Sequence, residues 1–285
     1  MKYAFVRDHR VEFPVNLMCK LLGVSCSGFY KWSAAAIGLE SLSKTKKTQA
    51  IKMVFHQHRK RYGSPRVFRE LKKIGHKISK KSVETIMRAN GLKAKAKRKY
   101  KNTTLSNHDR PVAPNLLERK FDETRIDAVW LSDITYLPLQ GGGFVYLCVV
   151  LDLASREVLG WHVDDNMETA LVSTALKNAI GTRGSIPKGI VFHSDQGSQY
   201  TSHEFVQLLW RHGFRQSMSR RGQCWDNAPM ESFFASLKEE YDEELFWFSG
   251  VEDARSGLFD YIETYYNRKR MHSGIGYQIP ACYES

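Results

Sequence analysis

The fold is decided by residues 130–152, WLSDITYLPLQGGGFVYLCVVLD. Residues 130–136 predict a strand, Gly141-Gly142-Gly143 predicts a turn, and the apolar run from Phe144 to Leu151, which ends at Asp152, predicts a second strand. Two strands joined by a glycine turn form a β-hairpin. A continuous apolar run is typical of a strand buried on both faces.

The segments after this hairpin set the fold class. A third strand is expected at 158–162, a helix at about 168–180 and a short buried strand at 189–193. Helices follow near 202–212 and 227–240. This order predicts an α/β fold: a ribonuclease-H-like mixed sheet flanked by helices, within a domain at 119–285 that ends in a helical extension.

Three carboxylates occupy unusual places in that order. Asp133 lies within the first strand, Asp195 directly follows the fourth, and Glu231 lies in a helix, with 61 and 35 residues between successive acids. A buried acid needs a charged partner, hydrogen bonds or a metal. Acids that gather repel each other unless a divalent cation neutralises them. Oxygen ligands select Mg2+ or Mn2+, and two such ions can support phosphoryl transfer. We therefore expect these acids to be catalytic metal ligands.

Nearby polar residues have two interpretations each. His193 shares a strand face with Asp195 and could orient a metal ligand or the scissile phosphate, although a hydrogen-bonded structural role is favoured. Asn227 precedes Glu231 by one helical turn, and contact with a metal-bound water or simple helix capping are equally expected. Asp152 is expected to cap a turn or pair with an Arg rather than to act as a fourth ligand.

Charge is distributed unevenly along the chain. Residues 1–110 hold 27 Lys and Arg against 6 Asp and Glu, whereas residues 111–285 hold 16 against 24. A segment this basic predicts a polyanionic partner, and double-stranded DNA fits best. No apolar run approaches the ~18 residues of a membrane span, and the charged N-terminus is unlike a secretory signal. The five scattered cysteines argue against a disulfide framework or a zinc site.

The basic half carries two helix-turn-helix patterns, which predict an all-α N-terminal region. The first, at 1–45, pairs helices near 14–22 and 26–32 around Gly23. In the second, at 46–101, Ser64 is expected to cap one helix, and Ser79 another whose outer face could lie in a DNA major groove. That face carries Lys80, Lys81 and Arg88. A plain helical hairpin with solvated lysines is the alternative.

A basic run follows the second pattern. Residues 93–101 have no burial pattern and are expected to follow phosphates, with the candidate contacts Lys95, Lys97, Arg98 and Lys99. Residues 102–118 predict a linker because they contain Asn, Ser and Pro at turn-forming positions.

The sequence blocks around the three acids resemble a known family. They look like the D, D and (35)E blocks of the OrfB transposases of insertion sequence family three, which are relatives of retroviral integrases. The likeness rests on residues 130–136, 193–200 and 217–234, on Tyr265-Tyr266-Asn267 with Arg270 and His272, and on Arg61-Tyr62-Gly63-Ser64-Pro65-Arg66 and Asn90-Gly91-Leu92. It covers nearly the whole chain.

The resemblance implies a DDE polynucleotidyl transferase: metal-dependent nicking frees a 3′ hydroxyl, which then attacks another phosphodiester. It implies that Asp133, Asp195 and Glu231 are the catalytic acids and that Lys238 contacts the element's end. Seven residues separate Glu231 from Lys238, so both lie on one helix face. A ribonuclease-H-like nuclease without joining activity and a DNA-binding regulator with an idle catalytic domain are the alternatives.

The resemblance also implies partners and a location. Family members are usually described as fusions with an upstream OrfA, which supplies an end-binding helix-turn-helix and a leucine zipper. This chain shows no sustained heptad repeat. Because two DNA ends must be brought together, a dimer or higher oligomer on DNA is expected. The expected location is the bacterial cytoplasm, in association with the nucleoid.

Overall fold

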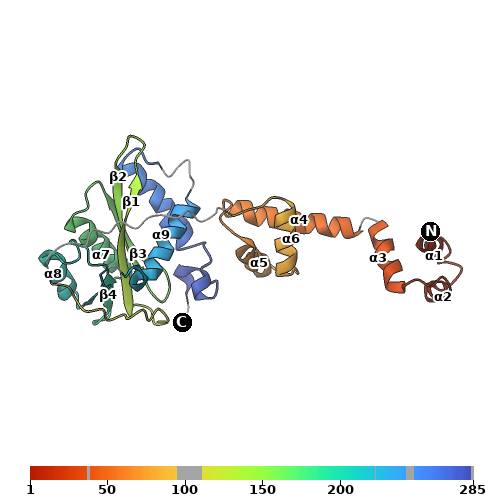
Figure 1. Cartoon of the computed structure of the whole chain (residues 1–285), viewed down its shortest axis with the longest axis horizontal. Helices are drawn as coiled ribbons and strands as arrows, with labels where there is room; N and C mark the ends of the chain where they lie inside the picture. Colours follow the sequence, from red (N-terminus) through yellow and green to blue (C-terminus); the bar gives the residue numbers. More distant parts are fainter. Residues whose placement is uncertain (37–38, 95–110, 222, 242–246, 284–285) are drawn as a thin grey trace. The chain divides into compact units, whose positions relative to one another are not determined.

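The structure is a computed structural model that describes residues 1–36, 39–94, 111–221, 223–241 and 247–283. The chain forms two compact units, Met1–Ala94 and Lys95–Ser285 (Figure 1). The boundary separates the helical region from the region that contains the sheet. Lys95, Lys97, Arg98 and Lys99 lie outside the described residues, and so do residues 102–110 of the predicted linker.

The first unit is helical, as predicted. Its first three helices are α1 (Lys2–Asp8), α2 (Val15–Leu21) and α3 (Cys26–Ala36). Their shared core consists of Val6, Met18, Cys19 and Phe29. Gly23 between α2 and α3 has a φ of 62°, which explains why glycine occupies the predicted turn. Helix α1 was not predicted.

Three further helices complete this unit. They are α4 (Leu39–Gln57), which was not predicted, α5 (Ser64–Lys73) and α6 (Lys80–Ala89). The backbone N–H of Ser82 donates to Ser79 Oγ at 3.2 Å, which confirms the predicted cap of α6. The predicted Ser64 cap is wrong: extended Gly63 holds the cap position, and Ser64 is the first helical residue. Buried contacts come from Val67 and Leu71 of α5 and from Val83, Ile86 and Met87 of α6.

The second unit is built on a mixed sheet. Its strands are β1 (Val129–Pro138), β2 (Phe144–Asp152), β3 (Val158–Asp164), β4 (Val191–Ser194) and β5 (Arg215–Met218), in the order β3-β2-β1-β4-β5. The β1–β2 and β2–β3 pairs are antiparallel, whereas β1–β4 and β4–β5 are parallel. The predicted hairpin and the mixed sheet are confirmed, and β5 is an additional strand.

Helices cover both faces of this sheet (Figure 1). Helices α7 (Thr169–Arg183) and α8 (His203–Arg211) pack with Trp130, Phe192 and Phe214 in one apolar cluster. Helix α9 (Ala228–Glu240) contacts β1 from the other side. This arrangement leaves alternate residues of β1 facing either the apolar cluster or α9.

The C-terminal segment closes the second unit. It contains α10 (Val251–Phe259), a π-helical turn (Asp260–Tyr266) and two short 3-10 turns, Ser273–Ile275 and Pro280–Cys282. The Asn267 amide pairs with the backbone of Val158 in the edge strand β3, donating to its carbonyl and accepting from its N–H at 2.9 Å each. This pairing gives the Tyr-Tyr-Asn block a structural role.

Residues 114–118, which the sequence placed in a linker, pack against this unit. The backbone N–H of Leu116 donates to Ser217 Oγ at 2.9 Å, and Met218 N–H donates to the Pro114 carbonyl. Leu117 is buried. Across the part of the chain that the structure describes, no helix combines the length and apolar character that crossing a membrane requires.

Candidate catalytic site

The β1–β4 register places the first two acids side by side. Leu131 of β1 pairs with His193 of β4, and the strands are parallel. Asp133 follows Leu131 by two residues, and Asp195 follows His193 by two residues. Because side chains alternate along a strand, both carboxylates lie on the same face of the sheet as Leu131 and His193. The sheet therefore brings together two residues that are separated by 61 intervening residues in the sequence.

Local backbone groups orient both aspartates. Asp133 Oδ1 accepts from its neighbour's backbone, Ile134 N–H, at 2.8 Å. Asp195 Oδ1 accepts from Gly197 N–H at 3.0 Å. A Cβ at position 197 would lie 3.0 Å from that same Oδ1, so glycine leaves the carboxylate room. In each aspartate, Oδ1 is thus fixed by a backbone N–H of its own chain segment.

The third acid comes from α9. Glu231 lies in the first turn of this helix, where the N-terminal end of the helix dipole favours a negative charge. The side-chain amide of Asn227, the residue that precedes α9, donates to the Ser132 carbonyl at 3.1 Å. This bond fixes the start of α9 against β1, next to Asp133.

The charges of Asp195, Glu231 and Lys238 all influence the pKa of Asp133. The pKa of Asp133 is raised well above its ordinary value, first by burial, then by the negative charge of Asp195, and further by Glu231. Lys238 opposes this shift. The pKa of Lys238 is itself lowered by burial, and its Nζ lies 5.1 Å from the centre of the Tyr136 ring. The predicted acids and Lys238, the predicted DNA contact, therefore lie near enough to affect the ionisation of Asp133.

The acids lie near one another without forming a closed coordination shell. Within the described ranges, no three His, Cys, Asp or Glu side chains are grouped closely enough to hold a metal ion. Carboxylates without a cation between them repel, which favours such spacing. The donor set nevertheless fits a hard cation, because its ligands are all oxygens. Asn227 Oδ1 adds a buried acceptor that has no hydrogen-bond partner among the described residues.

His193 is fully buried and hydrogen-bonded. Its Nδ1 lies 2.8 Å from Ser217 Oγ, and its Nε2 lies 3.1 Å from Ser219 Oγ and 3.0 Å from the Asp226 carbonyl. Burial lowers the pKa of His193 to about 4, so the ring is neutral at physiological pH. These bonds tie β4 to β5 and to the turn before α9, as the favoured structural interpretation expects.

Asp226 is a site residue that the sequence analysis missed. It is fully buried, and its carboxylate accepts from Arg220 Nε and Nη2 at 3.0 Å each and from Arg119 Nε at 2.6 Å. Asn115 adds a bond at 3.0 Å. The hydrogen bonds from Arg220 hold the pKa of Asp226 well below its usual range. This ion cluster anchors the turn Cys224–Asn227, which leads into α9.

Asp152 has the turn-capping role that the sequence favoured. Its Oδ1 accepts from the backbone N–H and the hydroxyl of Ser155, at 2.7 and 2.8 Å. Its Oδ2 accepts from Asp127 N–H at 2.9 Å. These bonds satisfy the carboxylate inside the turn between β2 and β3.

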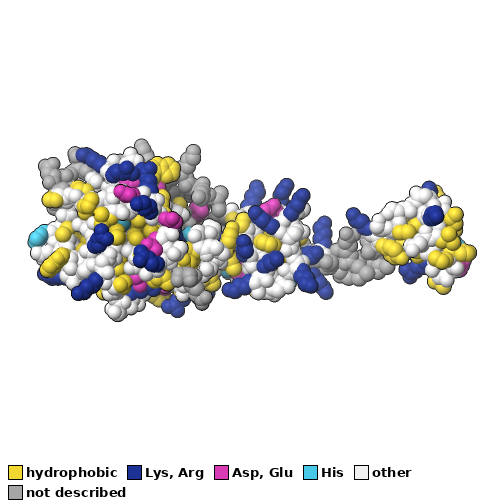
Figure 2. Space-filling view, turned by 90° about the horizontal axis from the view of Figure 1, so that it is seen from below, with side chains coloured by type: hydrophobic (Ala, Val, Ile, Leu, Met, Phe, Trp, Pro, Cys, Tyr) yellow, Lys and Arg dark blue, Asp and Glu magenta, His cyan; other side chains and the backbone are white. Residues whose placement is uncertain are grey.

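The candidate DNA contacts in the first unit are exposed. Lys80, Lys81 and Arg88 all lie on the solvent side of α6, and Lys80 Nζ makes a 4.0 Å contact with Glu84. Figure 2 shows many Lys and Arg side chains over the region of α4–α6. The charged face that the sequence predicted is therefore present on this helix.

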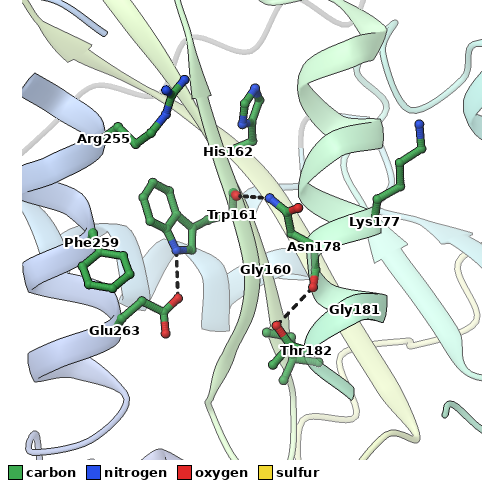
Figure 3. Close-up of a pocket in the computed structure, with 11 residues that line it drawn as sticks. Gly160, Trp161, His162, Lys177, Asn178, Gly181, Thr182, Arg255, Phe259 and Glu263 are labelled. Carbon is green, nitrogen blue, oxygen red and sulfur yellow. Dashed lines mark hydrogen bonds between the residues drawn. The ribbon is translucent and has the colours of Figure 1, made fainter. Parts of the chain in front are cut away.

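The second unit also contains a pocket of about 610 Å3 (Figure 3). It is lined by β3, α7, α10 and the π-helical turn that follows α10. Its residues bond to each other: Trp161 Nε1 donates to Glu263 at 2.9 Å, and Asn178 Nδ2 donates to the Trp161 carbonyl at 3.0 Å. Its lining contains none of the predicted site residues. The acids instead lie at the β1–β4 pair beside α9.

The sheet order and its flanking helices define the class of the second unit, a ribonuclease-H-like integrase core. Residues 123–224 and 212–280 match the family models described as integrase core domain, and residues 43–100 match an HTH-like domain. The HTLV-2 integrase catalytic core domain, solved with magnesium, is similar with a TM-score of 0.42 and 15% identity, over 55% of this chain and 94% of that chain.

Full-length relatives identify the family more narrowly. Transposase InsF for insertion sequence IS3A of Escherichia coli is 38% identical over 289 residues, which cover 100% of this chain and 99% of the relative. A 31 kDa protein of insertion element IS600 from Shigella sonnei is 36% identical over 93% of this chain and 97% of the relative. The chain belongs to the IS3 family of insertion sequence transposases.

Proposed function

We propose that the chain is a DNA strand transferase that nicks the ends of its own insertion element and joins the freed 3′ hydroxyl to a target phosphodiester. In this proposal Asp133, Asp195 and Glu231 are the catalytic acids. One observation is the main support. The carboxylates come from β1, the end of β4 and α9, and the charges of Asp195 and Glu231 are close enough to raise the pKa of Asp133. Full-length similarity to IS3 transposases supports the same assignment.

The acids would hold Mg2+ or Mn2+, and two ions per site fit the chemistry. Bound divalent cations activate the attacking oxygen and stabilise the leaving oxygen in phosphoryl transfer. The chain's own contribution is to fix the oxygens: Ile134 and Gly197 N–H groups orient Asp133 and Asp195, and α9 carries Glu231. Lys238 supplies a positive charge beside these acids, where a DNA phosphate would lie.

The decisive experiment replaces one acid by its neutral isostere. Asp133→Asn is expected to abolish Mg2+-dependent cleavage and joining of the element's terminal DNA and to leave DNA binding largely intact. The exposed residue Asp165 provides a matched control, because Asp165→Asn makes the same chemical change away from the site. Cleavage by Asp133→Asn at the wild-type rate would contradict the proposal.

Two alternatives are separated by further assays. A nuclease without joining activity would cut the element's end but would not insert a supplied pre-cleaved 3′ end into a target duplex. A DNA-binding regulator would bind the end and show no metal-dependent chemistry on any terminal sequence. The proposed strand transferase inserts the pre-cleaved end, and Asp133→Asn prevents that insertion.

Helix α6 is proposed as the DNA-reading element of the first unit, with Lys80, Lys81 and Arg88 facing the DNA. Its exposed basic face and the match to an HTH-like domain support this role. Lys95, Lys97, Arg98 and Lys99 are proposed to extend the contact along the phosphates. Footprinting of the element's end should show major-groove protection that Arg88→Ala weakens, and unchanged protection would contradict this role for α6.

The proposed assembly has at least two chains on paired DNA ends, because strand transfer must bring both ends together. An upstream OrfA portion is proposed as a partner, and the bacterial nucleoid as the place of action. Light scattering of the complex with two terminal duplexes should give a mass of at least two chains. A complex with one chain per end and no pairing would contradict this assembly.

A further inference from the structure

Ser132, the residue before Asp133, is bonded to both of the other acid-bearing segments. Its hydroxyl lies 2.8 Å from the Tyr200 hydroxyl, and its carbonyl accepts from the Asn227 amide at 3.1 Å. Tyr200 belongs to the loop that follows Asp195, and Asn227 precedes the helix that carries Glu231. One residue of β1 thus contacts both the loop that follows Asp195 and the residue that precedes the Glu231 helix.

The bond to Tyr200 continues to Asp195 through the backbone. Tyr200 N–H donates to the Gly197 carbonyl at 3.0 Å, and Gly197 N–H donates to Asp195 Oδ1 at 3.0 Å. The Tyr200 carbonyl in turn accepts from Gln216 Nε2 of β5 at 2.8 Å. Tyr200 therefore links the loop that follows Asp195 to the strand that carries Asp133.

All three members of this network are buried. Ser132 is 0% exposed, Tyr200 1% and Asn227 5%. The thiol of Cys148 on β2 lies 3.6 Å from the Ser132 hydroxyl and 3.7 Å from the Tyr200 hydroxyl, which encloses the pair. Water cannot replace a lost partner at such a position, so each bond constrains geometry strongly.

The Ser132–Tyr200 hydroxyl pair and the Asp133 carboxylate lie on opposite faces of β1. Successive residues of a strand point to opposite faces, so Ser132 faces the apolar cluster while Asp133 faces α9. Tyr200 and Trp130 belong to that cluster, on the side of α7 and α8. The hydroxyl pair can therefore set the separation of the acids without occupying the space where DNA would bind.

We propose that Ser132, Tyr200 and Asn227 are positioning residues that fix the separation of Asp133, Asp195 and Glu231 and so preset the oxygen donors for divalent cations. This inference rests on the proposed function of the three acids. It assigns the Tyr200 hydroxyl, which touches none of the reacting groups, an effect on cation affinity through the geometry of Asp195.

The test measures Mn2+ binding by the full chain with isothermal titration calorimetry, together with thermal unfolding in the absence of metal. Tyr200→Phe removes only the hydroxyl and is expected to weaken Mn2+ binding about 10-fold, the lower end of effects seen when residues that orient metal ligands are changed. Tyr261→Phe is the matched control. Tyr261 is also fully buried, and its hydroxyl donates to Glu240 at 3.2 Å, outside the network. Its variant is expected to keep wild-type affinity.

Ser132→Ala provides a second variant that keeps the carbonyl bonded to Asn227. It is expected to weaken Mn2+ binding as Tyr200→Phe does, and the double variant should be no weaker than either single one, because both remove the same bond. Wild-type affinity in both single variants, even with a lowered Tm, would overturn the inference and show a purely structural role. Losses that add fully in the double variant would overturn it too.

Failure of the proposed function gives a different result. If the wild-type chain does not bind Mn2+, or if Asp133→Asn binds it equally well, the acids are not metal ligands and both proposals fall. If the wild-type chain binds Mn2+ through Asp133 and the Tyr200 and Ser132 variants bind it unchanged, only the positioning network is overturned.

Discussion

The negative charge of Asp133 serves the proposed function but lowers the stability of the metal-free protein. Burial and the neighbouring acids raise its pKa, so the folded state prefers the protonated carboxyl more than the unfolded state does. The stability of the metal-free protein therefore falls as pH rises from the ordinary Asp pKa of about 4 toward the raised value. A bound cation would remove this cost, because it favours the charged form.

We predict that Asp133→Asn raises the Tm of the metal-free protein at neutral pH. The amide keeps the shape of the side chain but removes the charge that Asp195 and Glu231 repel. The gain should shrink as pH is lowered toward 4, where the wild-type carboxyl is protonated. Differential scanning calorimetry between pH 4 and 8 measures this difference. A variant that is less stable than wild type at pH 7.5 would contradict the electrostatic account.

Gly160 shows how a single residue permits close packing of helix on sheet. A Cβ at this position would lie 2.3 Å from the Ala179 backbone nitrogen and 2.4 Å from the Ala175 carbonyl oxygen. Both atoms belong to the α7 backbone, which cannot yield easily. Gly160→Ala is therefore expected to destabilise the protein by about 1–3 kcal/mol.

Chemical unfolding of Gly160→Ala measures this cost, with Gly181→Ala as the control. Gly181 lies in α7 with open space around its missing Cβ, and alanine is favoured over glycine inside helices by about 0.5–1 kcal/mol. The two variants should therefore shift the free energy of unfolding in opposite directions. Equal shifts would show that α7 and β3 do not pack as closely as described.

The three acids could be found from the sequence because each lies in a distinctive block at a recognisable place in a strand or helix. Asp226 and Tyr200 could not, because their partners are distant in the sequence. Asp226 bonds to Asn115, 111 residues away, and Tyr200 bonds to Ser132, 68 residues away. Without the sheet register, nothing in the chain indicates that these residues meet.

Among the elements, short ones were harder to predict than long ones. The four-residue strand Arg215–Met218 carries two polar residues before Ser217 and has no alternating pattern long enough to detect. It forms only because β4 offers a parallel edge. In contrast, the hairpin of β1 and β2 is local, and its apolar pattern and glycine turn are sufficient to predict it.

A buried ion pair fixes the end of α9 to the C-terminal segment. Arg270 and Glu240 are 3% and 5% exposed, and Arg270 Nε lies 2.8 Å from Glu240 Oε2. Glu240→Gln leaves the guanidinium without its charged partner and is expected to cost about 3–5 kcal/mol. Denaturant unfolding provides the measurement.

Glu252→Gln serves as the control for that variant. Glu252 pairs with Arg255 at an exposed position on α10, where such pairs contribute about 0–1 kcal/mol. If Glu240→Gln were as mild as Glu252→Gln, the C-terminal segment would not hold α9 in place, and Arg270 would require another role.

The exposed basic face of helix α6 leads to a prediction for DNA binding. Replacement of Lys80, Lys81 and Arg88 by alanine should weaken DNA binding and lower the slope of log K against log salt by about 2 to 3, since each phosphate contact contributes about 0.9. Their exposure implies little change in stability. Fluorescence anisotropy over a salt series measures the slope.

A variant with equal loss of charge on the second unit is the control. Lys177, Lys188 and Arg211 are exposed, and their replacement by alanine should retain most of the slope. If both triple variants lost the same slope, binding would follow net charge alone, and α6 would have no special role.

In the proposed function, the two units of the molecule have opposite charge and separate tasks. The first 110 residues carry a large excess of Lys and Arg, and the rest of the chain has an excess of Asp and Glu. A basic helical unit suits the capture of DNA, whereas a site that concentrates cations needs surrounding acids. Composition alone could predict this division. Composition could not predict how the second unit is assembled, because β4, β5 and the segment before β1 meet only in the folded sheet.

The most direct test of the account is the position of a bound cation. Anomalous diffraction from crystals of the full chain grown with Mn2+ should show an ion held by the carboxylates of Asp133 and Asp195. Glu231 should lie within reach of the same site. An Mn2+ ion bound elsewhere, with the Asp133 and Asp195 carboxylates turned away from each other, would contradict the claim that these acids form a metal-dependent strand-transfer site.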